Sequence, residues 1–206
     1  MTFIHYPVQE QAVTDLYDNY VTRYKHLNKV NHFQLLTAET GAGKTYVTAM
    51  YIKRYHQNEE VLLFVPETLV GKWKRVLEEV GCDTNLVTIV GLKKTMPQKT
   101  IEDLLAMNKE FSLIVWDEVH TAKTRLKKIA PILTLNKDAF FLGITATAID
   151  QSFNEVRSMI NFFKAEGLFE DTLYKSLSSK AFIMYLNHVF KYRYTVGFTK
   201  DDIVEG

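Results

Sequence analysis

Residues 33–45 read FQLLTAETGAGKT, and this stretch decides the fold class. Its first five residues form a short, largely apolar run, which predicts a strand buried on both faces of a parallel sheet. Two glycines follow, and apolar residues at helical spacing begin after Lys44. A strand, a glycine-bearing turn and a helix in this order predict a phosphate-binding loop.

The residue types of the loop suit this chemistry. Gly41 and Gly43 let backbone N–H groups turn toward phosphate oxygens without obstruction by a Cβ atom. Lys44 is predicted to reach the β- and γ-phosphates, and the Thr45 hydroxyl to bind Mg²⁺. The alternative is a strand–helix turn that contains a lysine by chance, and the strand before and helix after the loop disfavour it. The predicted binding residues for ATP and magnesium here are Thr40, Gly41, Ala42, Gly43, Lys44 and Thr45.

A second site segment is FSLIVWDEVH, residues 111–120. Asp117 and Glu118 follow another buried apolar run, and ligands gather at the carboxyl ends of parallel strands. Asp117 can therefore hold Mg²⁺, while Glu118 can orient and deprotonate the attacking water. Taken alone, the pair could equally be a helix N-cap with a first-turn acid. Together with the phosphate loop, it predicts catalysis by Lys44, Asp117 and Glu118.

Short apolar runs alternate with longer amphipathic segments, which is typical of an α/β domain with a mainly parallel sheet flanked by helices. The predicted strands are Phe33–Thr37, Val61–Val65, Leu86–Val90, Leu113–Trp116 and Phe140–Thr145. The predicted helices are Val8–His26, Lys44–His56, Thr68–Val80 and Ile101–Met107. We assign residues 1–150 to the ATP-binding lobe. Residues 151–206 are predicted to be a helical extension of the same lobe, with helices at Phe153–Ala165 and Lys180–Phe190 and a mixed segment after them.

Four further stretches carry a family resemblance: YPVQEQAV (6–13), VPETLVGKW (65–73), DEVHTAK (117–123) and ITATAIDQSFNEV (144–156). With the phosphate loop they resemble, in order, the N-terminal lobe of superfamily-two helicases. The resemblance is strongest to the Swi/Snf-like branch of double-strand translocases. The closing FTKDDIVEG (198–206) looks like the segment at which the first lobe of that family leads into its second.

This resemblance implies a RecA-like P-loop NTPase fold and an ATP-dependent motor lobe that acts on nucleic acid, here double-stranded DNA. It implies that Gln9 reads adenine. Hydrolysis would be coupled to movement through His120, Thr145 and Thr147. The residues that would contact nucleic acid are Pro66, Thr68, Lys72, Lys93 and Lys94.

The chain departs from the family pattern at several points. Ala146 and Ala148 stand where that branch has Gly and Pro, and no aromatic residue directly precedes Gln9, so Tyr6 is the candidate for stacking on the base. Nothing in the chain resembles the second lobe with its arginine fingers, which are worth orders of magnitude in hydrolysis rate. We therefore expect weak ATP hydrolysis and a second RecA-like lobe supplied in cis or in trans.

Composition sets few limits on partners. The 206 residues are 47% hydrophobic and 24% charged, with a formal net charge of +1. Local basic stripes can still bind nucleic acid through its phosphates, although a solvated surface is the alternative reading of each stripe. Three such clusters occur: Lys72, Lys74 and Arg75; Lys93 and Lys94; and Arg125, Lys127 and Lys128. Trp73, beside the first cluster, is expected in the core rather than on a base.

Cys82 is the only cysteine, which excludes an internal disulfide and a cysteine-based zinc site. No signal peptide and no apolar run of membrane-spanning length is evident, so we expect an intracellular protein, cytoplasmic or nucleoid- or nucleus-associated, with no membrane partner. Two other functions stay open. A small P-loop kinase would need an acceptor pocket and an arginine-rich lid, for which the sequence gives no sign. A non-motor module that senses nucleotide or binds DNA, or half of a split ATPase, would keep the same motifs.

Overall fold

The computed structural model describes residues 6–21, 33–122, 124–146, 153–165, 177–186, 188 and 194–204. Within them lies one six-stranded sheet with the strand order β3-β2-β4-β5-β1-β6, and every neighbouring pair is parallel. The strands are β1 Phe33–Ala38, β2 Glu60–Pro66, β3 Val87–Leu92, β4 Phe111–Trp116, β5 Phe140–Thr145 and β6 Thr195–Phe198. An all-parallel sheet flanked by helices confirms the predicted RecA-like fold class.

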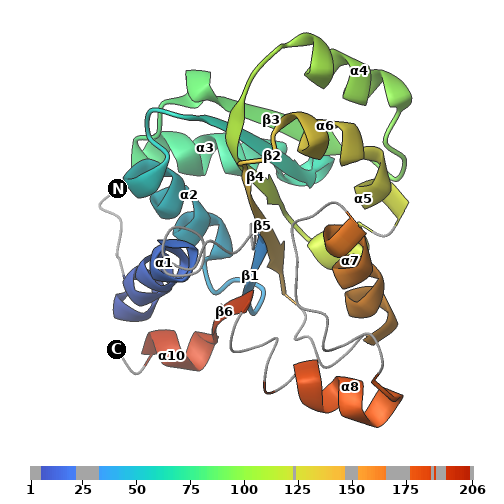
Figure 1. The fold of residues 1–206 in the computed structure, drawn as a ribbon. Helices are drawn as coiled ribbons and strands as arrows, with labels where there is room; N and C mark the ends of the chain where they lie inside the picture. The colour runs from blue at the N-terminus through green and yellow to red at the C-terminus, as the bar shows by residue number, and fades with distance from the viewer. Residues whose placement is uncertain are drawn as a thin grey trace.

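Helices connect the strands and cover both faces of the sheet (Figure 1). They are α1 Pro7–Tyr20, α2 Lys44–Tyr55, α3 Val70–Val80, α4 Gln98–Ala106, α5 Thr124–Lys128, α6 Ala130–Leu135, α7 Phe153–Ala165, α8 Ser179–Tyr185 and α10 Lys200–Val204. Short 3₁₀ turns lie at η2 Glu67–Leu69, η3 Thr84–Leu86 and η4 Val119–Thr121. None of the helices described is both long and apolar enough to cross a bilayer.

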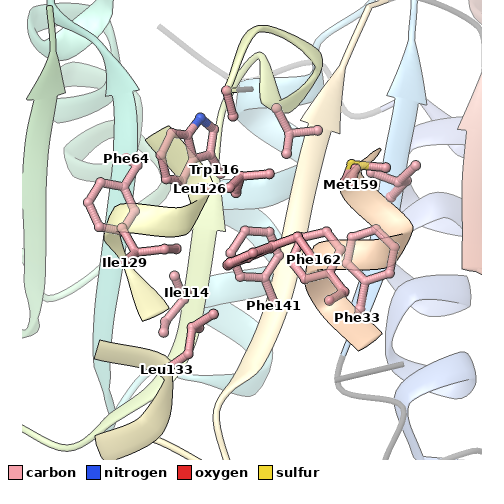
Figure 2. Close-up of a cluster of buried hydrophobic side chains, with 14 of the residues drawn as sticks. Phe33, Phe64, Ile114, Trp116, Leu126, Ile129, Leu133, Phe141, Met159 and Phe162 are labelled. Carbon is pink, nitrogen blue, oxygen red and sulfur yellow. The ribbon is translucent and has the colours of Figure 1, made fainter. Parts of the chain in front are cut away.

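The strands bury both of their faces because successive side chains point to opposite sides. On β1, Leu35 packs into one core with α4 to α8, whereas Leu36 packs into the other with α1, α2 and α3. Figure 2 shows the first core, where Phe33 and Phe141 of the sheet meet Phe162 and Met159 of α7. Each fully buried side chain of this size contributes about 1.5–3 kcal/mol through the hydrophobic effect. Because both faces of the central strands lie in a hydrophobic core, the sequences of these strands are almost continuously apolar.

The register brings the carboxyl ends of the strands to one edge of the sheet. Thr37 of β1 lies opposite Thr145 of β5, and Ala38 lies opposite Phe198 of β6. On the other side of the sheet, Trp116 of β4 pairs with Phe64 of β2. The segments that follow these strands therefore emerge side by side, and they include both predicted site segments.

All five predicted strands are present, within two residues at each end. The sequence did not predict β6, α5 or α6. The helix predicted from Thr68 is divided into η2 and α3, and the helix predicted at 180–190 corresponds to α8. The end of the helix predicted at 8–26 lies outside the described residues. The division of the chain near residue 150 stays a prediction.

Candidate nucleotide-binding site

The phosphate loop has the backbone conformation that its glycines allow. Gly41 has φ +87° and Gly43 has φ +95°, in the left-handed region that side chains with a Cβ rarely adopt. Gly43 caps the N-terminus of α2, where Val47 N donates to its carbonyl oxygen at 3.0 Å. The first N–H groups of α2 and the positive end of its dipole therefore face the loop, as an anion site requires.

Gln9 of α1 is hydrogen-bonded to the backbone of the loop. Its Nε2 donates a 3.0 Å hydrogen bond to the Ala42 carbonyl, and the side chain is almost completely buried. A Cβ atom on Gly43 would collide with the same Nε2. The structure thus brings Gln9 to the phosphate loop, while its reading of adenine stays a prediction. Tyr6, the candidate for base stacking, stands at the N-cap of α1 and is half-buried.

Lys44 folds back onto the loop that it belongs to. Its Nζ donates to the carbonyl oxygens of Ala38 at 2.6 Å and Glu39 at 3.1 Å. Burial lowers the pKa of the Lys44 ammonium, and the nearby carboxylates of Glu118 and Asp117 oppose this shift. The two predicted site segments therefore share one electrostatic environment.

Asp117 follows β4 and is held by donors on both carboxylate oxygens. Oδ1 accepts from the Glu118 N–H at 2.9 Å, and Oδ2 accepts from the indole Nε1 of Trp73 at 2.9 Å. Only 5% of the residue is exposed. Burial raises the pKa of the Asp117 carboxyl, and those two hydrogen bonds and the charges of Lys44 and Lys72 oppose the shift.

Glu118 occupies a left-handed backbone conformation, with φ 54° and ψ 46°. Such a conformation costs about 1–3 kcal/mol for a residue with a Cβ, and it recurs at functional sites. It points the chain into η4, where Thr121 donates from both its N–H and its hydroxyl to the Glu118 carbonyl. The Glu118 side chain is 30% exposed, so it is partly open to water.

His120 joins the acidic segment to the end of β5. Its Nδ1 lies 2.8 Å from the Thr145 hydroxyl and 3.4 Å from Glu118 Oε2. The ring nitrogen can donate to only one of these oxygens at a time, so the tautomer of His120 decides the donor and acceptor roles in its contact with Thr145. This contact brings together two of the three predicted coupling residues. Thr147, the third, lies outside the described residues, as does Lys123.

The residues fit a magnesium ion that is bound together with a nucleotide. Thr45, at the start of α2, and Asp117 supply a hydroxyl and a carboxylate, the oxygen ligands that Mg²⁺ prefers. Each Asp117 oxygen accepts one hydrogen bond from the described residues and keeps a lone pair for a metal or a water ligand. Among the described residues, no group of three or more His, Cys, Asp or Glu could hold a metal by itself.

The residues predicted to contact nucleic acid lie beyond the ends of β2 and β3. Pro66 ends β2, Thr68 is exposed in η2, and Lys93 and Lys94 are exposed after β3. Lys93 pairs with Glu67 at 3.3 Å, which ties these two segments together. Arg125 of α5 donates to the Lys93 carbonyl at 2.9 Å, so the second and third basic clusters adjoin.

Lys72 is placed differently from the other predicted contacts. It is exposed on α3, and its charge acts on Lys44 and Asp117 of the nucleotide site. The neighbouring Trp73 is fully buried, which confirms its predicted place in the core. Its hydrogen bond to Asp117 is a contact of the candidate site that the sequence did not reveal.

The fold and this site define the class of protein: a RecA-like, ATPase-type domain similar to the N-terminal lobe of superfamily-two helicases. The family model described as "Type III restriction enzyme, res subunit" matches residues 2–150, more than half of the chain. The chain belongs to this family.

Two helicases are similar to the chain in sequence. The uncharacterized ATP-dependent helicase YqhH of Bacillus subtilis is 23% identical over 176 residues, 77% of this chain and 31% of the relative. The uncharacterized killer plasmid pGKL-2 helicase of Kluyveromyces lactis is 26% identical over 158 residues, 71% of this chain and 26% of the relative. The chain thus spans less than a third of the length of either relative.

A solved structure has a similar fold. The Sulfolobus solfataricus SWI2/SNF2 ATPase core, in complex with dsDNA, superposes with a TM-score of 0.61 at 14% identity. The match covers 96% of this chain and 45% of that chain. At this identity the likeness concerns the fold alone.

Proposed function

We propose that this chain binds Mg-ATP at the carboxyl edge of its sheet and hydrolyses it slowly on its own, as the nucleotide-binding lobe of a nucleic-acid-dependent motor. One observation carries the proposal: the parallel register of β1, β5 and β4 brings the loop that follows Ala38 and the carboxylates that follow Trp116 to the same edge of the sheet, although they are far apart in the sequence. The charges of Glu118 and Asp117 there partly offset the lowering of the Lys44 pKa that burial causes. A lysine on a phosphate loop and two carboxylates at a neighbouring strand end are the parts that phosphoryl transfer to water needs.

Each residue has a definite task in this proposal. The N–H groups of the loop and of the first turn of α2 hold phosphate oxygens. Lys44 exchanges its two loop carbonyls for phosphate oxygens and neutralises the charge that develops there. Thr45 and Asp117 hold Mg²⁺, which when bound polarises the phosphates and offsets their charge.

Glu118 orients the attacking water and accepts its proton. Its side chain is partly exposed, which gives water access to the site. Its fixed backbone, immediately after the rigid end of β4, limits where the carboxylate can move. His120 and Thr145 then carry the state of the site to the end of β5 through their 2.8 Å contact.

The nucleic-acid partner in this proposal is duplex DNA, bound through its phosphates. The exposed lysines after β3 support it, as does the similar fold of an ATPase core whose structure contains dsDNA. A second RecA-like lobe, in cis or in trans, would supply the arginines that complete hydrolysis. The small share of each relative that the chain spans is consistent with this need.

A melting experiment tests nucleotide binding. Mg-ATP or a non-hydrolysable analogue at one hundred times its dissociation constant should stabilise the chain by about 2.7 kcal/mol. Lys44→Ala should lose most of this shift. Lys137→Ala, which changes an exposed lysine just before β5 at the opposite edge of the sheet, should keep it. Equal shifts in the two variants would contradict the assignment of the site.

A further inference from the structure

The last described segment of the chain runs beside the phosphate loop. β6 pairs in parallel with β1, and Phe198 lies opposite Ala38, the residue at which the loop begins (Figure 1). The residues after β6 and the residues after β1 must therefore leave the sheet next to each other. Thr199 and Lys200 are thus carried to the side of Glu39 and Gly41.

Contacts show how close this approach is. The backbone N–H of Lys200 faces Glu39 Oε2 at 3.4 Å. A Cβ atom built on Gly41 would lie 3.3 Å from Lys200 Cε and 3.5 Å from its Nζ. The end of the Lys200 side chain therefore lies against the glycine whose left-handed conformation opens the loop to phosphate.

The backbone around Lys200 is fixed by its own turn. Asp202 Oδ2 accepts from the Thr199 N–H at 2.6 Å and from the Thr199 hydroxyl at 2.8 Å. This carboxylate is therefore engaged with Thr199. Within the described part of the chain, the Lys200 ammonium forms no ion pair, although it is exposed beside a site built for anions.

We propose that Lys200 is a second phosphate-binding cation, which contacts the phosphate oxygens of a nucleotide in the loop from the β6–α10 side. The inference rests on the proposed nucleotide site and extends it. Lys44 approaches the phosphates from within the loop, whereas Lys200 approaches from a separate segment about 160 residues away. Nucleotide binding would thereby fix the β6–α10 segment against the loop.

The contact should contribute differently to the binding of different nucleotides. An ammonium group beside phosphates forms charge-assisted hydrogen bonds, which are stronger than neutral ones. ATP and ADP place several phosphate oxygens in the loop, whereas AMP places few. Lys200 should therefore strengthen the binding of ATP and ADP far more than that of AMP.

Calorimetry on the full chain with Mg-ATP, Mg-ADP and AMP tests this. Lys200→Met keeps the methylene chain and removes the charge, so it should weaken ATP and ADP binding about tenfold, close to 1.4 kcal/mol. AMP binding should change little, and Lys200→Arg should stay near wild type. Lys137→Met serves as the matched control, because it removes an equally exposed lysine from the opposite edge of the sheet.

Hydrogen exchange gives a second readout, in the wild-type chain and in the variant. Amides of residues 195–204 should exchange more slowly when Mg-ATP binds to the wild-type chain, and Lys200→Met should lose this added protection. A segment that only packs against the loop would not respond to the nucleotide.

The outcomes separate this inference from the function on which it rests. If the wild-type chain binds no Mg-ATP, the nucleotide site itself is wrong. If wild type binds and Lys44→Ala does not, yet Lys200→Met matches Lys137→Met, only the role of Lys200 is overturned. Tighter ATP binding by Lys200→Met would overturn it as well, because Lys200 would then obstruct the loop. Unchanged exchange at 195–204 on nucleotide binding would contradict the contact in the wild-type protein.

Discussion

The indole Nε1 of Trp73 donates a 2.9 Å hydrogen bond to Oδ2 of Asp117, so a residue of the hydrophobic core holds a carboxylate of the nucleotide site. Both partners are buried, and they come from different elements of the fold. The bond fixes the orientation of Asp117 and opposes the rise in its pKa that burial causes. Trp73 is in this sense a positioning residue for the proposed metal ligand.

Trp73→Phe should therefore raise the magnesium concentration needed for half-maximal ATP binding or hydrolysis. The phenyl ring keeps most of the packing, but Asp117 loses a donor. Loss of such a supporting contact typically costs about tenfold or more in metal affinity. A magnesium titration at fixed ATP measures the effect.

Trp116→Phe is the matched control. Trp116 is also fully buried, but its Nε1 has no hydrogen-bond partner among the described residues. Its replacement should alter stability through packing and leave the magnesium requirement unchanged. An equal shift in both variants would mean that packing, rather than the bond to Asp117, sets the requirement.

Gly43→Ala should damage the phosphate loop in two ways. The new Cβ would displace the Gln9 amide from Ala42, and the left-handed backbone is unfavourable for alanine. We expect loss of Mg-ATP binding and a drop in unfolding free energy of about 1–3 kcal/mol. Urea unfolding and nucleotide titration measure the two effects.

Gly71→Ala provides the contrast. Gly71 lies in α3 with no atom within 4 Å of a new Cβ, so this change should stabilise the helix by about 0.5–1 kcal/mol. In a Gln9→Ala background, Gly43→Ala should cost less than it does alone, because the collision is gone. If Gly43→Ala costs the same free energy of unfolding in both backgrounds, that cost comes from the backbone conformation and not from the collision with Gln9.

Glu118→Gln should separate binding from hydrolysis. The amide keeps the size of the side chain but cannot accept the proton of water, so Mg-ATP should bind nearly normally while turnover falls by about 10²–10⁴-fold. Turnover is best measured with a second lobe present, since the lone lobe is expected to be slow. Unchanged turnover would assign water activation to another residue.

Duplex binding by this lobe should be weak, independent of sequence and strongly dependent on salt. Each neutralised phosphate adds about 0.9 to the slope of log affinity against log salt concentration. Replacing both Lys93 and Lys94 with Gln should weaken binding to all duplexes alike and reduce that slope by roughly 2. A fluorescence titration against Lys137→Gln measures this. The absence of any complex at low salt would favour a nucleotide-sensing module instead.

Stability should fall as the pH is lowered, in part because of His56. The ring is buried, and burial lowers its pKa below the ordinary value of 6.5, although its contact with Glu59 opposes the shift. The unfolded chain therefore gains this proton first, and acidification favours unfolding. The contribution is fully present above pH 6.5 and is lost as the pH falls through and below that value. Urea midpoints between about pH 8 and pH 5.5 should decline less steeply in His56→Gln, and identical slopes would exclude His56.

The sequence predicted the parts of the site that depend on local order. The phosphate loop and the Asp117–Glu118 pair each follow a buried strand directly, and a parallel sheet brings such strand ends together. The two loop glycines are informative by themselves, because glycine adopts the positive φ of a tight turn without the steric penalty that a Cβ atom brings.

The parts that it did not predict depend on long-range contacts. β6 has only four residues and includes Gly197, so its pattern is too short to indicate a strand. Its identity comes from pairing with β1. The bond from Trp73 to Asp117 is likewise invisible locally, because a tryptophan at helical spacing indicates a core position and not the partner of its indole nitrogen. α5 and α6 are short helices of five and six residues between β4 and β5, below the length at which periodicity is informative.

The pairing of β1 with β6 also determines at which stage of folding the phosphate loop reaches its native conformation. Thr37 Oγ1 donates to the carbonyl of Val196, which is 159 positions further along the chain. During synthesis, the glycine-rich motif is complete well before residues 195–198 are made, so until then β1 lacks its neighbour on one side. Closing so long a loop slows folding more than it weakens the folded state. The ability to hold nucleotide should therefore appear late in refolding, in step with the docking of β6, and not when the motif itself first collapses.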